Sequence, residues 1–227
     1  FSIIFYYFFH YSSIKDDKII YIEKGKNLKE ISYILENNNI IFSHYPFYFY
    51  FKLIGKDKSL HAGEYLFKKD ISFYSVLNNF NANNLIYRKI TIPECYTIHD
   101  IRNLFSTNQY IKGDFLSNTL EGSIFPDTYF FLRDVNANKL IKRMQARMNQ
   151  KLDEVWKGNY RFFKSKNDLL TMASLIEAEA KKKEEKYMIS SVFHNRLKKN
   201  MKLQSDPTIL YAKNLQKKKN KNYKIYK

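Results

Sequence analysis

Cysteine, glycine and proline are scarce in this sequence of 227 residues, which contains 1 Cys, 6 Gly and 4 Pro. The single cysteine, Cys95, excludes an intrachain disulfide and leaves the redox compartment open. The sequence contains no Gly-rich phosphate-binding loop. Its 5 histidines do not share metal-ligand spacing with each other or with the cysteine, so we expect no metal and no cofactor.

Acidic residues are outnumbered, with 22 Asp and Glu against 39 Lys and Arg, which gives a formal net charge of +17. Such a balance suits an anionic partner. The lysines are scattered, however, whereas nucleic-acid-binding proteins gather basic residues on one element and combine them with aromatic platforms. A Lys-, Asn-, Ile-, Tyr- and Phe-rich composition is also typical of AT-rich genomes. We therefore do not expect nucleic acid as a partner.

The first residues, FSIIFYYFFHYSS, form an apolar and aromatic stretch that is too short to cross a bilayer, which takes about 20 residues. It can be read as a core strand or as the end of a membrane helix whose beginning precedes Phe1. Dense Tyr and Phe suit the membrane interface. We therefore expect residues 1–16 to be the end of an N-terminal membrane anchor.

Residues 17–84 alternate between strand-like and helix-like patterns, which predicts a small α+β module. A helix is expected to follow Asn27, which is a candidate N-cap with Glu30 at position N3. The other expected elements are a strand at 18–25, an aromatic-rich helix at 43–54, a strand around Gly63 and a helix beginning near Ile71.

Residues 85–213 predict a mixed, mainly helical domain that opens with a second strand, turn and helix. A long amphipathic helix carries Leu140, Met144, Met148 and Leu152 at helical spacing. Further helices are expected after Asn167, which is a candidate N-cap, and over residues 184–199. Ser205 or Asp206 would cap a short helix that starts at Pro207. The Lys-rich residues 214–227 are expected to be a disordered tail.

The stretch MASLIEAEA at 172–180 carries two carboxylates inside an apolar run. On a helical wheel at about 100° per residue, Glu177 falls inside the apolar face and Glu179 at its opposite edge. That face is formed by Leu169, Ala173, Ile176 and Ala180. A desolvated carboxyl group holds its proton and can act as a general acid. The structural alternative is that Glu177 bonds a backbone amide or pairs with an arginine such as Arg196.

Several motifs together resemble the endolytic murein transglycosylases, the MltG or YceG-like family. In chain order they are HAGEYLF, ITIPECYTIHDI, LEGSIFPDTYFF, TMASLIEAEA and SSVFHNRLKKNMKLQSDPTILYA. The pair of VFHNRL and LQSDPT is the most specific of these. The resemblance implies a LysM-like module at residues 17–84, a YceG-like catalytic domain at 85–213, and a single membrane anchor at the N-terminus.

The resemblance implies that the chain cleaves the β-1,4 bond between N-acetylmuramic acid and N-acetylglucosamine within peptidoglycan glycan strands. The products would carry 1,6-anhydromuramyl ends, and Glu177 would be the single general acid/base. Five further positions would bind the glycan, namely Glu121, Asn195, Gln204, Ser205 and Asp206. The enzyme would be anchored in the bacterial cytoplasmic membrane with its catalytic domain outside, close to the machinery that polymerises glycan strands.

Four of these five substrate-binding residues also have a structural interpretation. Ser205 or Asp206 can cap a helix, Glu121 can stabilise a turn through a salt bridge, and Asn195 can pack between helices. Tyr129 could stack on a sugar ring or belong to the core.

The sequence departs from the family pattern at two positions and at its end. Ala178 stands where the family has a lysine, and Cys95 stands where it has a glycine, which predicts a strained turn. The resemblance stops soon after Ala212, so we expect an incomplete catalytic domain. The competing hypothesis is therefore a catalytically inactive remnant that acts only as a peptidoglycan-binding module.

Overall fold

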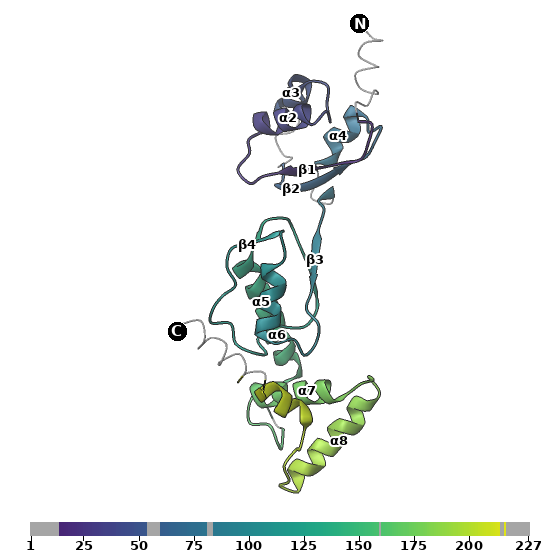
Figure 1. Ribbon diagram of the computed structural model, residues 1–227. Coiled ribbons are helices and arrows are strands. Elements are labelled where there is room, and N and C mark those ends of the chain that lie inside the picture. The colour runs from purple at the N-terminus through teal and green to yellow at the C-terminus, as the bar shows by residue number, and fades with distance from the viewer. Residues whose placement is uncertain (1–13, 54–59, 81–83, 159, 214–215, 217–227) are drawn as a thin grey trace. The chain divides into compact units, whose positions relative to one another are not determined.

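The computed structural model describes residues 14–53, 60–80, 84–158, 160–213 and 216, which form two units (Figure 1). The first unit contains Phe1–Ile90, Asn108–Gly113 and Thr128–Asn136, and the second contains Thr91–Thr107, Asp114–Asp127 and Ala137–Lys227. Helices and strands are mixed along the chain, which confirms the α+β class. Because the chain leaves the first unit and returns to it twice, that unit is built from three stretches of sequence. The expected domain boundary at residue 85 stays a prediction.

The first unit begins with two antiparallel strands separated by two helices. Strands β1 (Lys18–Ile22) and β2 (Gly63–Phe67) pair along their whole length, and Ile20 lies opposite Tyr65. The connecting helices are α2 (Leu28–Asn37) and α3 (His44–Leu53), and α4 (Phe73–Asn79) follows β2. Asn27 and Glu30 form the expected capping box at the start of α2. The strand and helix pattern predicted for this region is confirmed.

One hydrophobic core joins these elements. Its fully buried side chains include Ile22, Leu35, Phe47, Tyr65 and Phe67, which come from both strands and from α2 and α3. Helices α2 and α3 therefore cover the β1–β2 pair, as Figure 1 shows. Gly63 starts β2 at a φ of 151°, and a Cβ placed there would lie 2.5 Å from Cδ2 of Leu85. A side chain at this position would therefore collide with the core.

The later segments of the first unit add two further strand pairs. Strand β3 (Arg88–Thr91) pairs with β5 (Thr128–Phe131), and β4 (Ile111–Lys112) pairs in parallel with β6 (Val135–Asn136). Tyr129 is 7% exposed, so it belongs to the core and does not offer its ring to a sugar.

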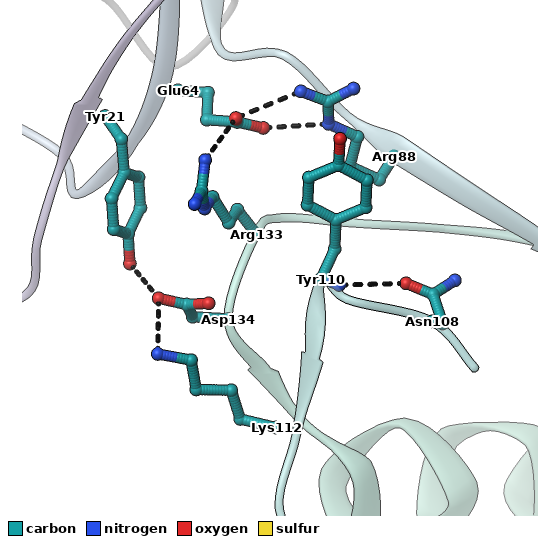
Figure 2. Close-up of polar contacts among 8 residues, drawn as sticks. All are labelled: Tyr21, Glu64, Arg88, Asn108, Tyr110, Lys112, Arg133 and Asp134. Atoms are coloured by element: carbon teal, nitrogen blue, oxygen red, sulfur yellow. Dashed lines mark hydrogen bonds and ion pairs between the residues drawn. The ribbon is translucent and has the colours of Figure 1, made fainter. Parts of the chain in front are cut away.

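A polar cluster connects the β1–β2 pair to these later segments (Figure 2). The Glu64 side chain is 2% exposed and accepts hydrogen bonds from Arg88 and Arg133. Beside it, the Tyr21 hydroxyl donates to Asp134, which also pairs with Lys112. Burial, followed by the contact with Asp134, raises the pKa of Tyr21 to about 12. Each charged group in the cluster therefore pairs with an opposite charge, and Asp134 also accepts a hydrogen bond from Tyr21.

The second unit is mainly helical. Its helices are α5 (Ile98–Ser106), α6 (Ala137–Val155), α7 (Lys166–Glu179) and α8 (Glu185–Lys198), with further helical backbone at residues 206–213. The amphipathic helix predicted from Leu140, Met144, Met148 and Leu152 is confirmed as α6, which buries Leu140, Met144 and Met148. The N-cap predicted at Asn167 is wrong. Ser165 caps α7 and forms a capping box with Asp168, because its hydroxyl lies one residue before the first helical turn.

Two expectations concern residues that the structure describes only in part. The expected membrane anchor at 1–16 falls mostly on residues 1–13, and the expected tail at 214–227 falls almost entirely outside the described residues. Among the helices of the described residues, none has both the length and the apolar character that crossing a bilayer requires.

Candidate active site

Helices α7 and α8 pack against each other around three buried side chains, Phe163, Met172 and Phe193. Partly buried side chains of α7 also pack against this cluster, namely those of Leu169, Leu175 and Ile176. On the wheel, Met172 and Leu175 flank Glu179, whereas Ala173 is exposed. The face predicted to be buried is therefore half-buried: Leu169, Ile176 and Ala180 are partly covered and Ala173 is not, whereas Met172, outside this face, is the buried residue of α7. The large side chains of Phe163 and Phe193 pack on Met172, and the small alanines of α7 offer less apolar surface for such packing.

Glu177 lies near the end of α7 with its side chain 32% exposed. The Lys186 ammonium, in the first turns of α8, donates to both of its carboxylate oxygens, at 2.7 Å from Oε1 and 2.6 Å from Oε2. This hydrogen bond raises the pKa of Lys186. The expected ion pair therefore exists, but its cation is Lys186 and not an arginine.

A turn before α5 faces the same ion pair. Burial raises the pKa of the Cys95 thiol, and the negative charges of Glu177 and Glu94 raise it further. Glu94 and Cys95 in turn contribute to the raised pKa of Lys186. Cys95 has a φ of 62°, so the strained turn expected from a residue in place of glycine is present.

The loop that contains the LQSDPT motif is fixed to α7 and α8 at two points. Ser205 is 3% exposed, and its hydroxyl donates to Oε1 of Glu179 at 2.6 Å. The Arg196 guanidinium donates to the carbonyl of Leu203 at 2.9 Å and to Oε1 of Gln204 at 2.8 Å. Glu179 and Arg196 therefore hold the loop from the ends of both helices.

The predicted substrate-binding residues of this loop have different surroundings. Gln204 is exposed and has a φ of 55°, whereas Ser205 is buried and immediately precedes the helical residues 206–213. Thr208 donates to the Ser205 carbonyl, so Ser205, rather than Asp206, occupies the cap position. Asp206 is exposed as the first helical residue. The side chains of Gln204 and Asp206 therefore remain accessible from solvent.

The other two predicted residues lie elsewhere in the second unit. Glu121 is exposed and accepts a hydrogen bond from the backbone N–H of Ile98 at 2.9 Å, at the N-terminus of α5. Burial, followed by the charge of Glu121, raises the pKa of Tyr211. Asn195 is exposed on α8. Glu121 therefore has the structural contact expected of a turn-stabilising residue, although its partner is a backbone amide.

The sequence did not predict two contacts, that of Lys186 with Glu177 and that of Glu179 with Ser205. Lys186 is nine residues after Glu177 and beyond the end of α7, so helical spacing could not connect the two. The wheel placed Glu179 at the edge of the apolar face, and helical spacing could not show its contact with Ser205, which is 26 residues later.

Comparisons with known proteins agree with the motifs of this unit. Residues 20–227 match the model of the YceG-like family. The chain belongs to this family. It is 33% identical over 234 residues to the endolytic murein transglycosylase of Bacillus subtilis, with 87% of this chain and 64% of that protein covered. It is 30% identical over 240 residues to the endolytic murein transglycosylase of Streptococcus pneumoniae, with 84% of this chain and 42% of that protein covered.

The chain therefore spans less than two thirds of the length of these curated relatives. A crystal structure of a yceG-like protein from Listeria monocytogenes is similar at a TM-score of 0.49 and 29% identity, over 87% of this chain and 76% of that one.

Proposed function

We propose that this YceG-like chain is a peptidoglycan lytic transglycosylase that cleaves the β-1,4 bond between N-acetylmuramic acid and N-acetylglucosamine within glycan strands. The observation that carries the proposal is the 33% identity to an endolytic murein transglycosylase over 87% of the chain. The half-exposed carboxyl group of Glu177, at the place where the family motif has its catalytic glutamate, is the proposed general acid/base.

One carboxyl group is sufficient for this reaction. Protonated Glu177 gives its proton to the glycosidic oxygen while the bond from C1 to that oxygen breaks. The hydroxyl oxygen on C6 of the muramyl residue then bonds to C1, and its proton returns to the Glu177 carboxylate. No water is consumed, so no second carboxylate has to activate water or attack the sugar, as hydrolases generally require. The accessible side chains of Gln204, Asp206 and Asn195 are suited to hydrogen-bonding sugar hydroxyl and acetamido groups.

The first unit supports a second proposal, that residues 17–84 form a LysM-like glycan-binding module. Its strands β1 and β2 are antiparallel neighbours, and both connecting helices lie between them in the chain.

The proposed N-terminal anchor would hold both units at the outer face of the cytoplasmic membrane. Separation of a cell lysate into membrane and soluble fractions tests this, and recovery of the full-length protein in the soluble fraction would contradict it.

Digestion of purified, insoluble peptidoglycan tests the proposed activity. Mass spectrometry of the released fragments should detect 1,6-anhydromuramyl ends with the wild-type chain and none with Glu177→Gln. Glu184→Gln, which neutralises an exposed carboxylate just before α8, is the matched control and should remain active. If the wild type binds peptidoglycan on sedimentation but releases no anhydro ends, the chain is a binding module only.

A further inference from the structure

The Glu177–Lys186 ion pair has a consequence for the proposed reaction. The Lys186 ammonium contacts both oxygens of the carboxyl group, at 2.7 and 2.6 Å. A cation in this position stabilises the ionised carboxylate. The proposed reaction, however, begins with protonated Glu177. Both oxygens would therefore have to lose an ammonium contact before the carboxyl group can protonate a glycosidic oxygen.

We propose that Lys186 is a positioning residue that holds the Glu177 carboxylate in the free protein and releases it when the carboxyl group takes up the proton used in catalysis. The inference rests on the proposed function. On release, the carboxylate takes one proton from a solvent hydronium ion, which becomes water, and the ammonium keeps its own three protons, so that the pair gains one positive charge. The cation next to the glutamate comes from α8, and position 178 is an uncharged alanine.

The surroundings of the pair support a movable contact. Both side chains are partly exposed, 36% for Lys186 and 32% for Glu177, so solvent can replace either partner. Among the described residues, Glu94 and Cys95, from the turn before α5, are titratable groups that also act on the pair. The negative charge of Glu94 also acts on Lys186, which favours an ammonium that stays nearby after leaving Glu177. Because partly exposed ion pairs contribute little to stability, Lys186→Met is expected to fold.

Competitive acetylation tests the ion pair without relying on activity. The contact with Glu177 raises the pKa of Lys186, so at a given pH Lys186 has less free amine than a lysine without such a contact. Lys186 should therefore react more slowly with acetic anhydride than exposed Lys183, as quantified by mass spectrometry of the peptides. In Glu177→Gln, the rate for Lys186 relative to Lys183 should rise severalfold. An unchanged ratio overturns the inference.

The pH–activity profile then tests the role in catalysis. In Lys186→Met, the ammonium no longer competes with the proton, so the alkaline limb of the profile should move to higher pH. Lys186→Arg keeps the cation and should retain the wild-type limb, and Lys183→Met controls for loss of one positive charge. A role limited to stability would leave the limb in place, and that result overturns the inference.

The proposed transglycosylase activity and the role of Lys186 can be refuted by different results. If the wild type forms no anhydro ends while acetylation of Lys186 still responds to Glu177→Gln, the ion pair exists but the proposed function and the catalytic role of Lys186 are both refuted. If anhydro ends form normally and Lys186→Met has the wild-type pH profile, only the role of Lys186 is refuted.

Discussion

Arg88 donates to both carboxylate oxygens of Glu64, from Nε to Oε2 at 2.8 Å and from Nη2 to Oε1 at 3.0 Å. Arg133 adds one bond to Oε1 at 3.1 Å. The guanidinium of Arg88 also lies 4.2 Å from the ring centroid of Tyr110, and that of Arg133 lies 4.7 Å from the ring of Tyr21. A buried carboxylate is thus neutralised by two cations that come from outside the β1–β2 pair (Figure 2).

The two arginines should contribute unequally to stability. Arg88→Met leaves buried Glu64 with a single bond, so we expect the free energy of unfolding to fall by about 2–4 kcal/mol. Arg133 has a side chain that is 40% exposed, and Arg133→Met keeps the two-bond contact. It should cost only about 1 kcal/mol. Urea denaturation of both variants measures the difference, and equal losses would contradict this view of the cluster.

The cluster also predicts how stability depends on pH. Burial alone would raise the pKa of Glu64, but the hydrogen bonds from Arg88 and Arg133 outweigh it and hold the pKa below its usual value. The stabilisation is therefore complete above the unfolded-state pKa of about 4.3 and is lost as the pH falls through the folded-state pKa.

Glu64→Gln provides the comparison, because its amide does not titrate. The stability advantage of the wild type over this variant should be constant near neutral pH and should shrink below about pH 4. Urea midpoints measured across this range test the sign. An advantage that grows on acidification would show that the folded state raises the pKa of Glu64.

Alanine substitutions at two glycines would distinguish the stability cost of backbone strain from that of steric overlap. Gly25 and Gly63 both have positive φ, 85° and 151°, but a Cβ at Gly25 meets nothing within 4 Å, whereas one at Gly63 lies 2.5 Å from Cδ2 of Leu85. Gly25→Ala should cost about 1 kcal/mol from strain alone. Gly63→Ala should cost about 2–4 kcal/mol, because Leu85 must also move. Thermal unfolding of both variants tests the order, and a smaller loss at Gly63 would refute it.

The bond between Ser205 and Glu179 should couple the two residues energetically. Each of Ser205→Ala and Glu179→Ala removes a hydrogen bond between a hydroxyl group and a carboxylate, at 2.6 Å. In a double-mutant cycle based on urea denaturation, we expect a coupling energy of about 1–2 kcal/mol. Arg196 provides the second attachment of the loop, so both single variants should still fold. Strictly additive losses would mean that the bond does not fix the loop in solution.

Local rules predicted the elements of the fold well. The capping box of Asn27 and Glu30, the alternation in Lys18–Ile22 and the apolar spacing of Leu140, Met144 and Met148 are each decided by neighbours within a few residues. Such patterns carry their own evidence in the sequence.

The helical wheel was only partly right for α7, because the packing partners of a helix decide which of its side chains are buried most. Leu169 and Ile176 of the predicted face do pack against the cluster, but the buried residue of α7 is Met172, which packs with Phe163 and Phe193. The contacts of Glu177 with Lys186 and of Glu179 with Ser205 likewise depend on how α7, α8 and the following loop are packed. Family motifs could name candidate residues in this region, but spacing could not show which charges meet.

The return of the chain to its first unit limits where the protein can be cut. Glu64 lies in β2, but its cations are supplied by Arg88 and Arg133, beyond residue 84. A fragment that ended at residue 84 would keep the buried acid and lose both counter-ions. Such a fragment should fold poorly above the pH at which Glu64 ionises, and its stable folding would need Glu64 replaced by a neutral residue.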